Sequence, residues 1–132
     1  MSAGDLGEFY GAGEFIIREG EVGTCMYVVQ QGEVEVFVES GGEEIQLNVL
    51  EPGSFFGEMA LFDKNVRSAS VRALGPARVL TIDKKNLMRR IHEDPALAFR
   101  LVETMSGRIR HQTELIKDLE RLLERSRILT SP

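Results

Sequence analysis

The feature that most constrains this chain is a change of hydrophobic period near residue 83. Before it, apolar residues gather in short runs separated by glycine and proline turns. After it, apolar residues recur every three or four positions, and no proline falls between Pro95 and Pro132. A period of two indicates strands and a period near 3.6 indicates helices. The chain is therefore expected to be mainly β, with C-terminal helices.

The first half predicts several short antiparallel strands. Residues 33–39 alternate valine with glutamate, broken only at Phe37, and residues 44–49 alternate in the same way. Gly32 is expected to supply the unusual backbone angle of a tight turn. Further turn signals stand at Gly41–Gly42 and Pro52–Gly53. Evenly spaced short strands predict an antiparallel double-stranded β-helix, or jelly roll.

The second half predicts a short helix and then a long one. Asp83 is expected to cap the first helix, and Asp94 followed by Pro95 is typical of a second helix start. The long helix carries a seam with alternating three- and four-residue steps, made of Val102, Met105, Ile109, Gln112, Ile116, Leu119 and Leu123. Such a seam predicts a parallel coiled-coil homodimer, and the alternative near residues 97–109 is packing along the chain's own barrel. Two parts are thus expected, a β-barrel over residues 1–93 and a closing and dimerisation helix over residues 94–132.

Composition narrows the function classes. A net charge of −5 disfavours a nucleic-acid-binding surface. No apolar run approaches the roughly 18 residues needed to span a bilayer, so no membrane partner is expected. Cys25 is the only cysteine, which precludes an intramolecular disulfide and favours a cytoplasmic location. His92 and His111 stand apart from clustered carboxylates, so neither a metal nor a metalloenzyme is expected.

Residues 55–71, here called the cassette, carry the polar signals of a ligand site. Gly57 lets a ligand approach the backbone, and residues 58–61 have the composition of one helical turn, whose N–H groups favour an anion. Arg67 can grip two phosphate oxygens, and Ser68 can add a hydroxyl or an N–H. Glu58 would repel a phosphate and is better suited to accept a hydrogen bond from a sugar hydroxyl. The cassette therefore predicts a ligand with one phosphate beside one ribose hydroxyl.

Residues 56–71 resemble the phosphate-binding cassette of cyclic-nucleotide-binding domains. That family shares the pattern Phe-Gly-Glu-(apolar)-Ala-Leu, a short variable stretch, and then Arg-(Ser/Thr/Ala)-Ala. The resemblance extends over nearly the whole chain, and residues 94–110 resemble the closing helix of the bacterial catabolite-activator and nitrogen-fixation-regulator group. It implies a set of ligand-binding positions, namely Val49, Phe56, Gly57, Glu58, Met59, Ala60, Leu61, Arg67, Ser68, Ala69, Arg108, Gln112 and Thr113.

The resemblance also implies roles for these positions. They are phosphate contacts from Arg67, Ser68 and Ala69, N–H and ribose contacts from Gly57, Glu58 and Ala60, and an apolar lining from Val49 and Leu61. In this family serine after the arginine is common in cAMP binders, so cAMP is expected, with cGMP as the alternative. Gln112 and Thr113 would touch the base, although relatives have a hydroxyl residue where Gln112 stands. Arg108 is expected either to pair with Glu58 or to be a solvated surface arginine.

The expected function is a regulatory module that binds cAMP and couples occupancy to movement of its C-terminal helix. It is not expected to be an enzyme or to need a cofactor besides its ligand. One alternative is a sensor fragment of a larger transcription regulator, channel or kinase, and another is a ligand-free dimerisation scaffold. A barrel enzyme is disfavoured because residues 14–83 contain no histidine. Nothing after Leu123 could form a helix-turn-helix, so no nucleic acid is expected to bind this chain.

Overall fold

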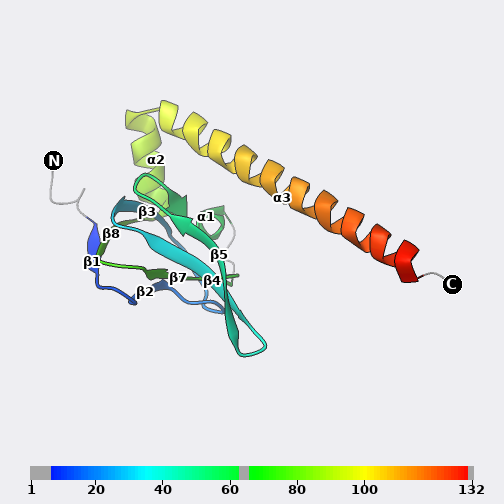
Figure 1. Ribbon diagram of the computed structural model, residues 1–132. Coiled ribbons are helices and arrows are strands. Elements are labelled where there is room, and N and C mark those ends of the chain that lie inside the picture. Colours follow the sequence, from blue (N-terminus) through cyan, green and yellow to red (C-terminus); the bar gives the residue numbers. More distant parts are fainter. Residues whose placement is uncertain (1–6, 63–65, 131–132) are drawn as a thin grey trace. The chain divides into compact units, whose positions relative to one another are not determined.

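A computed structural model describes residues 7–62 and 66–130, drawn in Figure 1. The chain divides into two compact units, within residues 1–88 and within residues 89–132. The division falls inside helix α2 (Lys84–Glu93), earlier than the junction at residues 93 and 94 that the sequence suggested.

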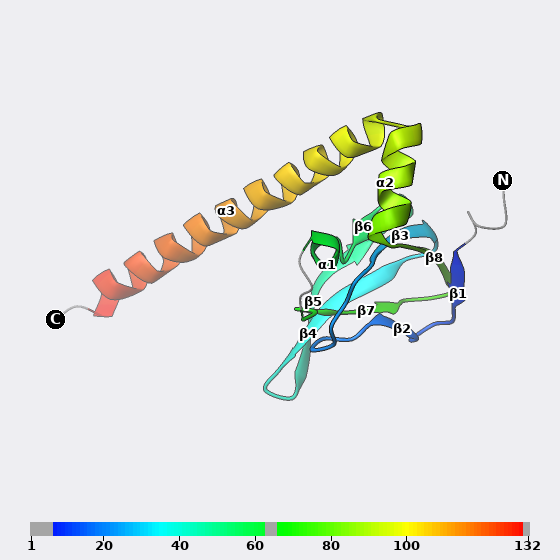
Figure 2. The ribbon, with the colours of Figure 1, turned by 180° about the vertical axis from the view of Figure 1, so that it is seen from behind.

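The described part of the first unit is a pair of antiparallel sheets, each with four strands. The first sheet has the order β1 (Glu8–Tyr10), β8 (Ala77–Ile82), β3 (Met26–Gln31) and β6 (Phe55–Phe56). The second has the order β2 (Phe15–Ile17), β7 (Ser70–Ala73), β4 (Val34–Ser40) and β5 (Glu43–Leu50). Figures 1 and 2 show the two sheets from opposite sides. The predicted jelly roll is confirmed.

Glycine turns place the strands. Gly32 lies between β3 and β4 with φ at +75°, a left-handed conformation that a residue with a side chain rarely adopts. The chain can therefore reverse direction there and pass from the first sheet to the second. The turn expected at Gly32 is confirmed.

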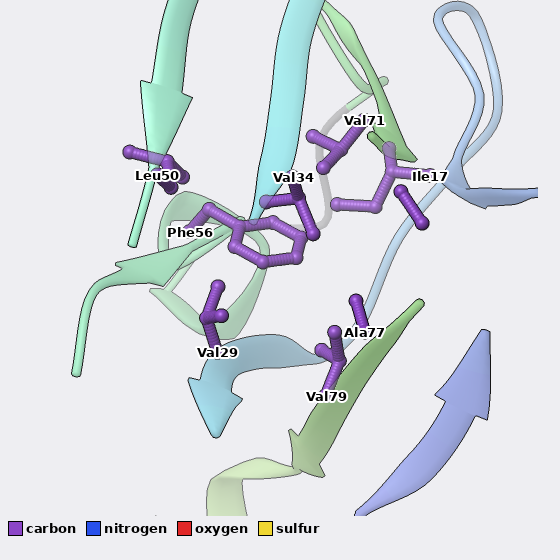
Figure 3. Close-up of a cluster of buried hydrophobic side chains, with 9 residues drawn as sticks. Ile17, Val29, Val34, Leu50, Phe56, Val71, Ala77 and Val79 are labelled. Carbon is purple, nitrogen blue, oxygen red and sulfur yellow. The ribbon is translucent and has the colours of Figure 1, made fainter. Parts of the chain in front are cut away.

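The core lies between the two sheets. Its buried side chains are Ile17, Val29, Val34, Leu50, Phe56, Val71, Ala73, Ala77 and Val79. Figure 3 shows side chains from both sheets meeting around the Phe56 ring. Each fully buried valine, leucine or phenylalanine contributes roughly 1.5–3 kcal/mol relative to an exposed one. Since Phe56 belongs to this core, hydrophobic burial anchors the start of the cassette.

The outer face of the second sheet is also partly buried, contrary to the simple alternation expected for residues 33–39. Phe37 is 1% exposed, and the Arg72 guanidinium lies 4.0 Å from the centre of its ring. The Phe15 ring meets it edge-on, with centroids 5.7 Å apart. Glu35, which the alternation placed in solvent, is 8% exposed because it accepts hydrogen bonds from Arg72 and Gln46.

The helices follow the predicted pattern. The Asp83 carboxylate accepts from the Asn86 N–H at 2.7 Å, which confirms the cap of α2. Helix α3 (Ala96–Thr130) then runs without interruption. The Asp94 carboxylate accepts from Arg100 at 3.0 Å instead of from a backbone N–H of the helix start. No helix in the described parts of the chain is apolar over a long enough stretch to cross a membrane.

Candidate functional site

A glycine with a left-handed backbone conformation lies near the start of the cassette. Gly57 follows β6 with φ at +74° and leads into the single turn of α1 (Met59–Phe62). A Cβ atom at this position would lie 2.8 Å from the Nη1 atom of Arg67 and 3.2 Å from the Cδ1 atom of Ile17. Both the backbone angle and the close packing therefore require glycine here.

Arg67 is held by its backbone in an irregular segment. Its N–H donates to the Glu21 carbonyl at 2.7 Å, and its carbonyl accepts from the Gly20 N–H at 2.9 Å. Strand β7 begins only at Ser70, so Arg67 and Ala69 lie outside this strand. The turn after β2 thus provides the hydrogen-bond partners of the Arg67 N–H and carbonyl groups, which a neighbouring strand would otherwise provide.

The guanidinium of Arg67 joins two parts of the cassette and also reaches the residue that precedes strand β3. Its Nη1 donates to the Gly57 carbonyl at 2.9 Å, and its Nη2 donates to the Cys25 carbonyl at 2.8 Å. Its Cζ lies 5.7 Å from the centre of the Tyr27 ring, which stacks on Phe56 with centroids 5.2 Å apart. No carboxylate within residues 7–62 and 66–130 forms an ion pair with Arg67. The guanidinium thus has a positive charge that none of these described carboxylates pairs with, and further N–H donors for an anion.

Tyr27 does not neutralise this charge. Burial raises the pKa of its hydroxyl, because the phenolate would be poorly solvated, and the nearby Arg67 opposes that shift only in part. The hydroxyl therefore stays protonated at neutral pH. Tyr27 acts on Arg67 as an aromatic neighbour and not as an anion.

The other predicted positions of the cassette differ in exposure. Phe56, Ala60 and Leu61 are buried, and Met59 is 56% exposed. Glu58 and Ala69 are half-buried, while Ser68 is exposed. The Ala60 N–H, which the resemblance assigned to the ligand, donates to the Gly57 carbonyl at 3.3 Å. Residues 63–65 of the cassette lie outside the described residues.

Val49 does not lie on the core side of its strand. It pairs with Glu35 across β4 and β5, while its neighbour Leu50 pairs with Val34 and belongs to the core. Because successive side chains of a strand point to opposite faces, Val49 shares the outer face with Glu35. The expectation that Val49 lines an apolar pocket beside Leu61 therefore disagrees with the strand register.

The remaining predicted positions belong to α3, in the second compact unit. Gln112 and Thr113 are exposed, and the Thr113 hydroxyl donates to the Ile109 carbonyl one turn earlier, at 3.0 Å. Arg108 is half-buried. A contact of these side chains with a base or with Glu58 stays a prediction.

Two participants were missed by sequence reasoning. The carbonyl of Cys25 carries no sequence signal, because any residue would supply it. Tyr27 lies outside the cassette motif, although its ring stacks on Phe56 and has the Arg67 guanidinium as a neighbour. The aromatic side chain of Tyr27 was the one available signal in the sequence. Its neighbours could not be predicted, because they are set by the pairing of distant strands.

Comparison with known proteins agrees with this geometry. The family model described as the cyclic nucleotide-binding domain matches residues 8–94. The cyclic AMP receptor protein of Thermus thermophilus is 34% identical over 111 residues, covering 83% of this chain and 51% of that protein. Isozyme 1 of the cGMP-dependent protein kinase of Drosophila melanogaster is 39% identical over 88 residues, covering 64% of this chain and 12% of that protein.

A solved structure gives the same assignment. The crystal structure of the Thermus thermophilus catabolite activator protein matches with a TM-score of 0.75 and 33% identity, covering 86% of this chain and 54% of that one. The chain belongs to the cyclic nucleotide-binding domain family. It spans about half or less of the length of these relatives.

Proposed function

We propose that this chain is a regulatory sensor whose preferred ligand is cAMP, and that α3 transmits the occupancy of its site. The chain is a cytoplasmic homodimer in this proposal, and it acts without catalysing a reaction and without binding nucleic acid. The two relatives named above differ in output, a receptor and a kinase, so the proposal covers the sensing step only.

The arrangement of Arg67 carries the proposal. Its guanidinium lies against the left-handed Gly57, is oriented by two carbonyl groups, and has no described carboxylate to neutralise it. Such a group is suited to two oxygens of a singly charged cyclic phosphate. The half-buried Glu58 is close in sequence and provides an acceptor for a ribose hydroxyl.

The choice of cAMP rests on Ser68, which follows the arginine and is exposed beside it. The named receptor of Thermus thermophilus is a cyclic AMP protein, which supports the same choice. The kinase named above is cGMP-dependent, so cGMP is the ligand to compare.

Coupling would occur by population shift. If one arrangement of the cassette and helix binds the nucleotide 100-fold better than another, occupancy can bias the equilibrium by at most about 2.7 kcal/mol. This bias is enough to change the state of most molecules when the two arrangements are nearly balanced in free energy. No chemical step is needed, since binding and release of the nucleotide are the signal.

Calorimetric titration with cAMP and with cGMP tests the proposal. We expect tighter binding of cAMP, and we expect Arg67→Ala to weaken binding by about tenfold to a hundredfold, because charge-assisted hydrogen bonds are lost. Arg78→Ala is a matched control, since Arg78 also donates to a carbonyl, that of Gly7 at 2.9 Å, but on another strand. This control variant should bind as the unchanged chain does.

Each outcome has a distinct meaning. Undiminished binding by a folded Arg67→Ala variant would refute the site. Tighter binding of cGMP than of cAMP would overturn only the ligand choice. Failure of the unchanged chain to bind either nucleotide would favour the ligand-free scaffold.

A further inference from the structure

We propose that Gly23 is a positioning residue for the phosphate site, because the absence of its side chain creates the space that the Arg67 guanidinium occupies. Gly23 lies between β2 and β3 and is buried. It is outside the cassette, and no ligand role was expected for it from the sequence. The inference rests on the proposed function, in that Arg67 is taken to hold the phosphate.

The contact concerns the guanidinium itself. A Cβ atom added to Gly23 would lie well inside 3.0 Å of the Nε, Cζ and Nη2 atoms of Arg67, and these are its three nearest neighbours. Real Cβ atoms essentially never approach other atoms so closely. Two residues further on, the Cys25 carbonyl accepts from the same Nη2 atom at 2.8 Å. Residues 23–25 therefore line one side of the space that the Arg67 guanidinium occupies, here called the seat of Arg67. Gly23 leaves room for the guanidinium, and Cys25 supplies a carbonyl acceptor.

The backbone does not explain this glycine. The φ angle of Gly23 lies outside the left-handed region, in contrast to Gly32 at +75°. A Cβ atom on Gly32 would meet the backbone of Pro76 and Ala77, which cannot move easily. The three atoms nearest to a Cβ atom on Gly23 all belong instead to the far end of a flexible side chain, that of Arg67. Alanine at position 23 is thus expected to leave the fold intact and to displace the guanidinium.

Displacement matters because the guanidinium is preorganised. Its present position allows both the 2.9 Å hydrogen bond to the Gly57 carbonyl and the 2.8 Å hydrogen bond to the Cys25 carbonyl. A side chain as long as arginine has considerable rotamer freedom, and a binding group held in place avoids paying that entropy when the ligand arrives. Binding groups usually need to lie within about 0.5 Å of their productive position. A methyl group on Gly23 would force a larger shift.

Calorimetric titration of Gly23→Ala with cAMP tests the inference. We expect affinity to fall by about tenfold or more, the effect of losing one charge-assisted hydrogen bond. Gly75→Ala is the matched control, because it makes the same chemical change where no atom lies within 4 Å and where φ is also outside the left-handed region. Its affinity should equal that of the unchanged chain. A Gly23→Ala variant that binds equally well would overturn the inference.

A double variant distinguishes positioning from a general effect on the fold. If Gly23 acts through Arg67, Gly23→Ala combined with Arg67→Ala should bind cAMP no more weakly than Arg67→Ala alone, measured up to millimolar cAMP. Additive losses would contradict the inference. The unfolding midpoints of the unchanged chain, the two single variants and the double variant give a second double-mutant cycle, measured without ligand. There, any destabilisation by Gly23→Ala should vanish once Arg67 is alanine, because the overlapping atoms are gone.

The two cycles separate this inference from the proposed function. If Gly23→Ala fails to fold but the double variant folds, the overlap with Arg67 is supported. If both fail to fold, Gly23 has another structural role and the inference is wrong. If the unchanged chain binds no cyclic nucleotide, the proposed function fails, and the unfolding cycle alone decides whether Gly23 seats Arg67.

Discussion

Single residues in this domain have roles that depend on partners far away in the sequence. Arg67 receives its orientation from a carbonyl 42 positions earlier and from another 10 positions earlier. Arg67 could be identified from its motif. The residues that orient its side chain could not be predicted, because every residue type supplies the same backbone carbonyl. The sequence therefore identifies the charged group of this site, and the tertiary structure determines where that group is held.

Gly32→Ala is predicted to destabilise the domain strongly. Left-handed backbone costs a residue with a side chain roughly 1–2 kcal/mol, and the added Cβ would also lie 2.9 Å from the Cα atom of Ala77. We expect the free energy of unfolding to fall by about 2 kcal/mol or more. Urea denaturation measures it, with Gly75→Ala as the control that should leave the midpoint unchanged. Equal midpoints for the two variants would show that the turn adapts.

At the scale of elements, strand β4 has buried side chains on both faces. Its inner valines pack in the core, and on its outer face Arg72 covers Phe37 and joins Glu35 of β4 to Glu44 of β5. The Arg72–Glu35 distance is 2.7 Å and the Arg72–Glu44 distance is 2.8 Å. The alternating sequence predicted the strand correctly but not its second buried face, which the Arg72 side chain of the neighbouring strand β7 creates.

The Glu35 network predicts a loss of stability in acid. The hydrogen bond from Gln46, and then that from Arg72, lowers the pKa of Glu35 below its ordinary value of 4.5. The native state therefore favours the carboxylate, so the stabilisation is present above pH 4.5 and is lost as the pH falls through the lower pKa of the folded state. Glu35→Gln should thus be less stable than the unchanged chain at pH 7, with a difference that shrinks below pH 4.5.

Unfolding midpoints of the two proteins between neutral and acidic pH measure this effect. Glu44→Gln is a suitable comparison, because Glu44 pairs with the same arginine but has a side chain that is 46% exposed. Its effect should be smaller, since water screens an exposed ion pair. Parallel pH profiles for Glu35→Gln and the unchanged chain would contradict the expected linkage.

At the scale of the whole molecule, α3 carries a stripe of exposed apolar side chains. Val102, Ile109, Ile116, Leu119 and Leu123 are between 57% and 62% exposed. These are five of the seam positions of the predicted coiled coil, and successive members are seven, seven, three and four residues apart. A partner helix would bury them, which is why a homodimer is part of the proposed function.

Leu119→Asp is predicted to weaken the homodimer. Burial of one leucine contributes roughly 1.5–3 kcal/mol, and a symmetric dimer would lose two such contributions while burying two charges. We expect mainly monomer at micromolar concentrations, measured by sedimentation velocity. Thr104→Asp adds the same charge at an exposed position outside the seam and should leave the dimer intact. A chain that is monomeric without any substitution would refute the dimer itself.

The sequence by itself determined what depends on local chemistry. Several features depend on only a few neighbouring residues, so the sequence alone predicts them. They are the change of period, the turn at Gly32, the cap at Asp83 and the motif around Gly57 and Arg67. The outer position of Val49, the burial of Glu35 and the seat of Arg67 were decided only by the tertiary structure. They depend on which strands pair, in which register, and on side chains brought together from distant segments. Local pattern does not encode these pairings, because the free energy that selects them comes from the packing of the whole domain.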